Sequence, residues 1–183
     1  EGSVSVVFFG EGATEEGVFF ESVNIASLMK LPVVFICEDN GLSVYSDTSV
    51  RQPQERRNSE IVNALGVSSM EGDSYKVESL WKPMKSAFEE VRKGRGPVFV
   101  KITTTRYLEH CGPNRDDHLG YRDAGQLAEI EKRDLLNLIE QELIEKGLIR
   151  IGTVNQLETD IKDLFDLVES GEVGDEHRTV NWS

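Results

Sequence analysis

The sequence predicts an α/β protein whose sheet is largely parallel and flanked by helices. Runs rich in β-branched and aromatic residues, which are typical of strands, alternate with segments whose apolar residues recur at helical spacing. The run PVVFIC at 32–37 is apolar throughout, as in a parallel strand that is covered on both faces. The segment between the first two runs is long enough for the helix of a right-handed crossover connection.

The first elements follow from local signals. A strand is expected at 3–9, and Thr14 is expected to cap a helix that continues to Met29. Apolar residues at helical spacing would give that helix one apolar face. Residues 38–57 have no apolar period, so we expect a long loop there. Loops of such length in compact domains are usually functional or disordered.

The later elements alternate in the same way. Pro83 is tolerated in the helix expected at 79–93 only if it lies in the first turn, and Thr153 with Gln156 predicts a capping box. The tail from Gly171 is polar and is expected to fray. The other expected elements are a short helix at 59–65, a strand at 67–70, a turn at 71–73, a strand at 98–103, an irregular segment at 106–122 and amphipathic helices at 126–146 and 154–169.

The length of 183 residues fits one domain with a sizeable core, or a piece of a larger one. We expect an α/β domain at 1–150 and a C-terminal helix and tail at 151–183. Because a strand begins almost at Glu1, we expect the chain to be a fragment or to lack earlier elements of its fold.

The composition excludes several classes of partner. The formal net charge is −13 and no long basic run offsets it, so nucleic acids and anionic membrane surfaces are not expected partners. No apolar run approaches the roughly 20 residues that span a bilayer, and we expect no signal peptide before the first strand. Cys37 and Cys111 are the two cysteines, too few for a disulfide framework, which favours a reducing compartment.

Polar loops follow three of the expected strands, starting at Gly10, at Glu38 and at Thr104. Ligands of parallel sheets bind beyond the carboxyl ends of the strands, so we expect the three loops to meet at one edge. The first loop, GEGATEEG, has the glycines of a phosphate-binding loop but carries three carboxylates, which repel phosphate. We expect Glu15 and Glu16 to stabilise the N-terminus of the following helix, by about 0.3–1 kcal/mol each.

Two nucleotide-binding motifs fit this loop poorly. A dinucleotide fingerprint, G-x-G-x-x-G, would need its third glycine where Glu15 stands, although Glu38 imitates the acid that binds the ribose. No Gly-Lys-Ser/Thr sequence follows the glycines, which excludes a Walker loop. An NAD-binding protein therefore stays a minor alternative.

A divalent cation between the loop and a phosphate would turn the repulsion into an attraction. Mg²⁺ prefers one or two side-chain oxygens together with diphosphate oxygens. Glu11 would supply a carboxylate oxygen, and Asn40, after the next strand, would supply an amide oxygen without a further negative charge. The small residues Gly12 and Ala13 would let the backbone approach the phosphates closely.

The same residues resemble a known family. Gly10-Glu11-Gly12 followed by Asp39-Asn40 resembles the GDG…NN motif of thiamine diphosphate enzymes. The text from 12 to 40 is similar to the α-subunit of the E1 component of 2-oxo acid dehydrogenase complexes, of the pyruvate, branched-chain and acetoin types. The likeness spans roughly residues 3–150 and implies a thiamine-diphosphate-binding fold that lacks its N-terminal elements here. It continues through 63–67, 71–73, 92–97, 105–110 and 120–122.

The resemblance implies a role for each matching residue. Mg²⁺ would be bound by Glu11, Asn40 and the backbone carbonyl of Leu42. Arg106 and His110 would act beside the reactive centre, where the histidine supports acyl transfer to lipoamide. The residues that would bind thiamine diphosphate are Gly10, Glu11, Gly12, Ala13, Asn40, Leu42, Arg106 and His110.

By the same resemblance, the chain would be the α-subunit of an oxidoreductase that decarboxylates a 2-oxo acid and passes the acyl group to lipoamide. Its partners would be an E1 β-subunit, in an α2β2 heterotetramer, and a lipoyl-bearing E2 acyltransferase. Its location would be the cytoplasm of a bacterium or the mitochondrial matrix. A non-catalytic assembly module of the same fold is the alternative, because the N-terminal half is missing and Glu11 stands where the family has Asp.

Other departures concern single positions. Asp39 replaces the first Asn of the motif, and Cys111 replaces a Ser or Thr, so phosphorylation at that position is not expected. Cys111 has no orienting partner that would make it and the adjacent His110 a nucleophile and base. A transition-metal cluster would match no strong ligand spacing. Its side chains would be Glu109, His110, Asp116, Asp117 and His118.

Overall fold

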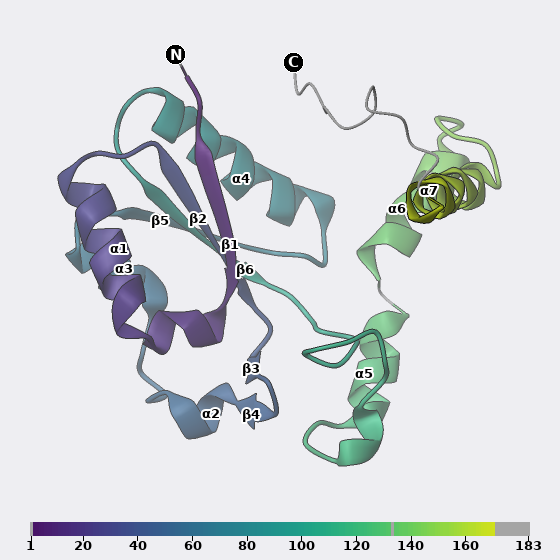
Figure 1. Cartoon of the computed structure of the whole chain (residues 1–183), viewed down its shortest axis with the longest axis horizontal. Coiled ribbons are helices and arrows are strands. Elements are labelled where there is room, and N and C mark those ends of the chain that lie inside the picture. Colours follow the sequence, from purple (N-terminus) through teal and green to yellow (C-terminus); the bar gives the residue numbers. More distant parts are fainter. Residues whose placement is uncertain (1, 133, 171–183) are drawn as a thin grey trace. The chain divides into compact units, whose positions relative to one another are not determined.

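The computed structural model describes residues 2–132 and 134–170 (Figure 1). Contacts divide the chain into two compact units, Glu1–Leu135 and Leu136–Ser183, and each is described by itself. The predicted boundary at residue 150 stays a prediction. The elements are β1 (Ser5–Gly10), η1 (Glu11–Glu15, a 3₁₀ helix), α1 (Gly17–Leu28), β2 (Val33–Asp39), β3 (Leu42–Ser43), β4 (Ser46–Asp47), α2 (Thr48–Arg51), α3 (Asn58–Ala64), β5 (Ser68–Asp73), α4 (Val77–Arg92), β6 (Val98–Thr103), η2 (Asp117–Leu119, a 3₁₀ helix), α5 (Ala124–Glu131), α6 (Leu135–Glu145) and α7 (Thr153–Glu169).

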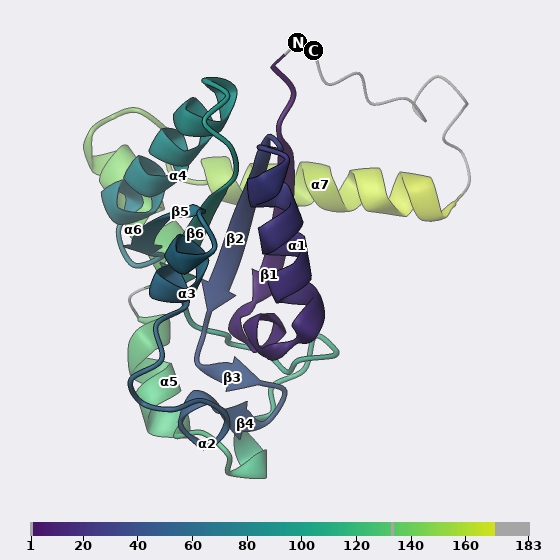
Figure 2. The same cartoon turned by 90° about the vertical axis from the view of Figure 1, so that its left-hand side faces the viewer.

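Four strands form one parallel sheet in the order β1-β2-β6-β5. The register places Gly10 beside Glu38, and Asp39 beside Thr103, so the carboxyl ends of three strands lie along one edge. Figure 2 shows the short β3 and β4 hairpin at that end of β2. The predicted α/β fold, with a parallel sheet flanked by helices, is confirmed.

The two faces of the sheet bury alternate residues of β2 and β6. Phe35, Cys37 and Phe99 lie on one face, where they pack with α1 and α3. The opposite face packs against α4 (Figures 1 and 2). Residues of β2 and β6 in that second core are Val34, Ile36, Val98, Val100 and Ile102. Coverage from both sides explains why both strands read as continuous apolar runs.

The edge strand β1 keeps part of one face open. Val6 is 38% exposed and Phe8 is 62% exposed, and Trp81 of α4 is 64% exposed. Between β1 and α4 lies a pocket of about 820 Å³, with a mostly apolar lining that includes Phe8 and Trp81. We call this pocket the β1–α4 trough.

Helix α4 begins at Val77, and Pro83 is therefore in its second turn. The expectation that Pro83 lies in the first turn is wrong. A proline has no N–H, so the Ser79 carbonyl, four residues earlier, loses its helical donor. This carbonyl faces β5: a Cβ built on Gly72 would lie 2.2 Å from the Ser79 oxygen and 2.9 Å from Pro83 Cγ. The close approach of α4 to β5 thus depends on a residue without a side chain.

The start of α1 also differs from the prediction. Thr14 does not cap this helix, because it lies inside η1, where its hydroxyl donates a 2.6 Å hydrogen bond to the Glu11 carbonyl. Glu16 occupies the N-cap position of α1, without a side-chain capping bond. The hydroxyl that was expected to open one helix instead stabilises the 3₁₀ turn before it.

Two predictions about helices and turns in the middle of the chain need correction. The turn predicted at 71–73 is the end of β5, because these residues pair with β6. The single helix predicted at 126–146 is two helices, α5 and α6. Asp134 lies directly before α6, and aspartate favours the position that precedes a helix.

Among the described residues, the helices of the second unit are α6, apart from its first residue, and α7. The helix predicted at 154–169 is confirmed, but its predicted capping box is not formed: the Thr153 hydroxyl donates to the Arg150 carbonyl at 2.7 Å, and the Gln156 amide donates to Asp160 at 2.8 Å. The fraying predicted from residue 171 lies outside the described residues. No helix within 2–132 or 134–170 is long and apolar enough to cross a bilayer.

The segment before α4 gives a prediction about acid stability. Asp73 accepts hydrogen bonds from the Ser79 hydroxyl at 2.5 Å and from the Tyr75 N–H at 2.9 Å, and the Ser79 bond lowers the pKa of Asp73. We expect Asp73→Asn to lower the free energy of unfolding at pH 7 by about 1 kcal/mol, because a neutral amide oxygen accepts weaker hydrogen bonds than an ionised carboxylate. Because the pKa of Asp73 is lower in the folded than in the unfolded state, the ionised carboxylate stabilises the folded state at pH values above the unfolded pKa, which is near 3.8. This stabilisation is lost as the pH falls through the folded pKa. Urea unfolding at several pH values should therefore show the difference between the two proteins shrinking as the pH falls below 3.8, and a constant difference would contradict the assignment.

Candidate functional site

The residues that follow β1 and β2 lie next to each other at the carboxyl edge of the sheet. Glu11 opens η1 directly after β1, and Asn40 follows β2. The strands are paired to their last residues, and the Thr104 N–H donates to the Asp39 carbonyl at 2.9 Å. The predicted meeting of the three polar loops at one edge therefore follows from the register of the sheet.

Glu11 is the central buried charge of this edge. Its side chain is 2% exposed, and its Oε1 accepts a hydrogen bond from Arg51 Nη2 at 2.5 Å. Its Oε2 is buried and has no hydrogen-bond partner among the described residues. Burial raises the pKa of Glu11, although the Arg51 guanidinium opposes that shift. One guanidinium thus compensates the buried carboxylate incompletely, and a further cation at Oε2 would stabilise the charged form.

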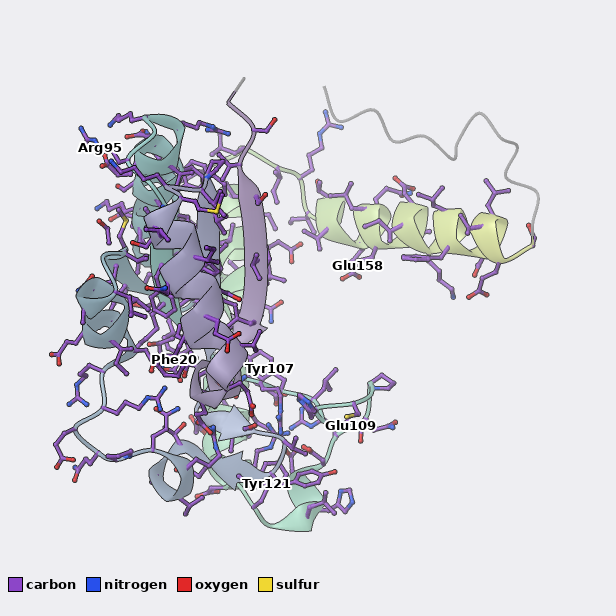
Figure 3. The ribbon with its side chains drawn as sticks, turned by 60° about the vertical axis from the view of Figure 1, so that its left-hand side comes forward. Phe20, Arg95, Tyr107, Glu109, Tyr121 and Glu158 are labelled. Atoms are coloured by element: carbon purple, nitrogen blue, oxygen red, sulfur yellow. The ribbon has the colours of Figure 1, made fainter. Side chains whose placement is uncertain are left out.

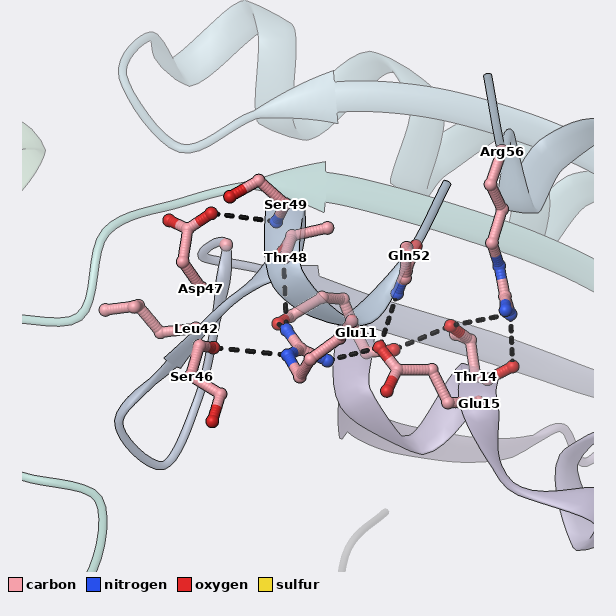
Figure 4. Close-up of polar contacts among 12 residues, drawn as sticks. Glu11, Thr14, Glu15, Leu42, Ser46, Asp47, Thr48, Ser49, Gln52 and Arg56 are labelled. Atoms are coloured by element: carbon pink, nitrogen blue, oxygen red, sulfur yellow. Dashed lines mark hydrogen bonds and ion pairs between the residues drawn. The ribbon is translucent and has the colours of Figure 1, made fainter. Parts of the chain in front are cut away.

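Arg51 also ties Glu15 to the same cluster. The Glu15 carboxylate accepts from Arg51 Nη1 and, at 2.6 Å, from the Gln52 amide (Figure 4). The expectation that Glu15 and Glu16 both serve the helix N-terminus is therefore wrong for Glu15, whose partners lie more than 35 residues away along the chain. Glu16 is exposed at the N-cap.

A further arginine joins the same two segments. Arg56 Nη2 donates to the backbone carbonyl of Thr14 (Figure 4). The sequence does not predict that Arg51, Gln52 and Arg56 contact η1, because they occur in a segment without periodicity and no local pattern connects them to it.

Asn40 and Leu42 lie in a tight turn beside η1. Asn40 Oδ1 accepts from the Leu42 N–H at 3.0 Å, and Gly41 between them has a φ of 74°. The following strand β3 lies directly against η1, since a Cβ built on Gly12 would be 2.7 Å from the Ser43 hydroxyl oxygen. The sequence-predicted ligands Glu11, Asn40 and Leu42 are thus on adjoining elements, and Gly12 is a position where a side chain would not fit without a shift of Ser43.

Arg106 connects the 104–123 segment to the β3–β4 hairpin. Its Nη2 donates to the Val44 carbonyl at 2.8 Å and to the Tyr121 hydroxyl at 2.7 Å. Its Nε and Nη1 are buried without a hydrogen-bond partner among the described residues. Arg106 lines a pocket of about 350 Å³ together with Asn40 and Leu42. Unsatisfied guanidinium N–H groups beside these residues favour an anionic ligand in this pocket.

A buried aspartate holds this arginine. Asp116 accepts from the Tyr121 hydroxyl at 2.5 Å and from Arg122, and its Oδ2 is 3.8 Å from Arg106 Nη2. Burial acts to raise the pKa of Asp116, but the hydrogen bond from Tyr121 and the charges of Arg122 and Arg106 lower it overall. Asp116 therefore stays ionised and fixes both arginines.

His110 and Cys111, in contrast, are exposed in the same segment. Figure 3 shows Glu109 and Tyr121 at this end of the first unit, and Glu109 accepts from the Asn114 amide at 2.8 Å. The roles predicted for His110, and for Gly10 and Ala13 at the diphosphate, stay predictions. Across residues 2–132 and 134–170, no group of three or more His, Cys, Asp or Glu side chains could hold a metal ion, which argues against the transition-metal cluster considered in this segment.

Comparison with known proteins gives consistent matches. A family model described as "Dehydrogenase E1 component" matches residues 1–169. The chain is 31% identical over 167 residues to the chloroplastic pyruvate dehydrogenase E1 component subunit alpha-3 of Arabidopsis thaliana, covering 89% of this chain and 37% of that protein. It is 27% identical over 163 residues to the pyruvate dehydrogenase E1 component subunit alpha of Rhizobium meliloti, covering 88% and 46%. The chain thus spans less than half the length of these relatives.

Solved structures match over a smaller part. A transketolase from Leishmania mexicana has a TM-score of 0.45 and 21% identity, covering 56% of this chain and 15% of that one. A putative thiamin diphosphate-dependent enzyme from Mycobacterium smegmatis has a TM-score of 0.41 and 21% identity, covering 56% and 18%.

Proposed function

Since the chain belongs to the dehydrogenase E1 component family, we propose that it is α-subunit sequence of an enzyme that decarboxylates a 2-oxo acid with thiamine diphosphate and Mg²⁺. The 2-oxo acid proposed is pyruvate, because the relatives compared above are pyruvate dehydrogenase E1 α-subunits by name. The observation that carries the proposal is the buried Glu11, whose Oε2 has no partner among the described residues at the edge where Asn40 and Leu42 lie.

The residues present fit a magnesium–diphosphate group. A carboxylate, an amide oxygen and a backbone carbonyl are the hard oxygen donors that Mg²⁺ prefers. Glu11, Asn40 and the Leu42 carbonyl would hold the metal. Because Gly12 has no side chain, η1 packs closely against Ser43 of β3. Backbone N–H groups of this turn would then contact the diphosphate.

The chain's other residues would bind and orient the cofactor. The backbone of Gly10, Gly12 and Ala13 would contact the diphosphate, and the unpaired N–H groups of Arg106 would bind an anionic group in the adjoining pocket. His110 would act at the entrance and support acyl transfer. Thiamine diphosphate, when bound, supplies the carbanion chemistry of decarboxylation.

The proposed partners follow from the family. They are an E1 β-subunit, in an α2β2 heterotetramer, and an E2 acyltransferase. The lipoyl group of that E2 would accept the acyl group. The proposed locations are the cytoplasm of a bacterium and the mitochondrial matrix. A plastid is added to them, because relatives carry chloroplastic as well as mitochondrial names.

The experiment uses the full-length natural chain with its β-subunit. Isothermal titration with thiamine diphosphate should show binding that requires Mg²⁺ and is lost in excess chelator. Asn40→Ala removes one proposed metal ligand, so we expect binding to weaken at least about tenfold. Magnesium-independent binding, or binding that Asn40→Ala leaves unchanged, would contradict the assignment.

A non-catalytic assembly module is the second candidate. The ion pair of Glu11 with Arg51, and the Glu that stands where the family has Asp, favour it, since both concern the carboxylate expected to hold the metal. This candidate predicts a stable complex with the β-subunit that binds no thiamine diphosphate at any magnesium concentration. The NAD-binding alternative predicts calorimetric binding of NAD that does not depend on Mg²⁺.

A further inference from the structure

We propose that Arg51 is a positioning residue for the metal site: it holds Oε1 of Glu11 and so directs Oε2 toward the metal. The proposal rests on the proposed function, because it assumes that Glu11 is a magnesium ligand. It assigns a role to a residue 40 positions from Glu11 in the sequence. It also gives a physical reason for a glutamate where the family resemblance has an aspartate.

The guanidinium of Arg51 is anchored on its own loop. Its Nε donates to the Ser46 carbonyl at 3.1 Å, and its Nη2 contacts the Thr48 hydroxyl at 3.3 Å. The side chain is 13% exposed. Contacts with the β4–α2 segment therefore fix the orientation of the guanidinium independently of its contacts with η1.

The same guanidinium then binds both acids of η1. Nη2 donates to Glu11 at 2.5 Å, and Nη1 donates to Glu15, which the Gln52 amide also holds. Arg51 thus bridges two carboxylates with one positive charge. A net charge of −1 remains on these three side chains, and among the described residues Glu11 Oε2 is a buried carboxylate oxygen without a hydrogen-bond partner.

The contacts of the two carboxylate oxygens of Glu11 indicate whether Arg51 would help a metal to bind or would compete with it. If Arg51 competed with a metal, it would occupy the oxygens that a metal needs. Here it binds one oxygen, and the other is buried without a hydrogen-bond partner among the described residues. A carboxylate can bridge a guanidinium and a metal in this way, and partners that hold a metal ligand typically change metal affinity by about 10–100-fold.

The side-chain length at position 11 fits this arrangement. The family resemblance has Asp where this chain has Glu11, which is longer by one methylene group. The additional methylene group extends the carboxylate further from the backbone of η1, and its Oε1 is bound by the guanidinium of Arg51. Arg51 would then fix a side chain that has one more rotatable bond than aspartate, and so limit the entropy lost when the metal binds.

The test measures metal binding directly on the full-length chain assembled with its β-subunit. Mn²⁺ is titrated in the presence of thiamine diphosphate, and free Mn²⁺ is followed by electron paramagnetic resonance. We expect Arg51→Gln to raise the Kd for Mn²⁺ about 10–100-fold. Arg57→Gln is the matched control: Arg57 lies on the same loop, and its Nη1 donates to the Gln54 and Arg56 carbonyls on an exposed surface, so the Kd should not change.

A second measurement separates positioning from a merely structural role. At saturating Mn²⁺, the affinity of Arg51→Gln for thiamine diphosphate should return to that of the wild type, because only the metal ligand is misplaced. Arg51→Lys keeps the charge but cannot bridge Glu11 and Glu15 in the same fork geometry, so we expect partial recovery of the Mn²⁺ affinity. It also serves as the folded variant if the glutamine variant does not assemble.

The outcomes are distinct. An unchanged Kd in a folded Arg51 variant overturns the positioning role and leaves the proposed function intact. A lower Kd shows that Arg51 competes with the metal, which also overturns the proposal. A wild-type complex that binds no Mn²⁺ with thiamine diphosphate refutes the proposed function and this inference together.

Discussion

Glu11→Gln is expected to weaken magnesium-dependent binding of thiamine diphosphate at least about a hundredfold, equivalent to about 2.8 kcal/mol. Glutamine keeps the size of the side chain but removes the anionic oxygen that the metal would bind. The substitution also leaves Arg51, which is 13% exposed, with Glu15 as its remaining ionic partner in the cluster. Calorimetry on the full-length chain with its β-subunit measures the effect.

Glu16→Gln provides a control for charge alone. Glu16 lies five residues from Glu11, is exposed and makes no side-chain capping bond, so its removal should leave cofactor affinity unchanged. Glu11→Asp tests the side-chain length: it keeps the charge, and we expect metal binding that depends less on Arg51 than in the wild type. Equal losses in the Glu11 and Glu16 variants would show that only the overall charge matters.

Gly72→Ala is expected to lower the free energy of unfolding by about 3 kcal/mol. The new Cβ would lie 2.2 Å from the Ser79 carbonyl oxygen and 2.9 Å from Pro83 Cγ. The first of these atoms belongs to the backbone of α4 and cannot rotate away, so the helix itself would have to move from the sheet. Urea unfolding followed by circular dichroism measures the change.

Gly17→Ala is the matched control for that substitution. Gly17 is the first residue of α1, and a Cβ there would have no atom within 4 Å. Alanine favours helix over glycine by up to about 1 kcal/mol, so this variant should be as stable as the wild type or more stable. A similar loss in both variants would show that the Gly72 result comes from glycine chemistry in general and not from contact with α4.

The fold could be predicted where the signal is local. The apolar runs of β2 and β6 are buried from both sides, and this burial is the reason why they contain no polar alternation. The position of Pro83 could not be predicted in the same way. Its tolerance in the second turn of α4 depends on Gly72, in a different element, which leaves room for the carbonyl that the proline cannot bond.

In the candidate site too, some residues could be predicted from the sequence and others could not. Glu11 and Asn40 could be placed at one edge because parallel strands bring their carboxyl ends together, whatever the sequence between them. The position of Arg51 could not be predicted in this way, because it lies 40 residues from Glu11 in the sequence. It also belongs to a four-residue helix that is too short to show apolar periodicity. Glu15 was misassigned for that reason: its local position suggested a helix terminus, while its actual partner is distant.

The open β1–α4 trough has a consequence for the behaviour of this chain in solution. An edge strand with exposed Val6 and Phe8, in the same trough as the exposed Trp81, is the kind of surface that favours association between copies of a chain. The net charge of −13 opposes that adhesion by mutual repulsion. The repulsion reaches only about 8 Å at physiological ionic strength and about 3 Å in molar salt. Colloidal stability of the isolated chain therefore decreases as salt is added, and dilute buffer of low ionic strength keeps it dispersed.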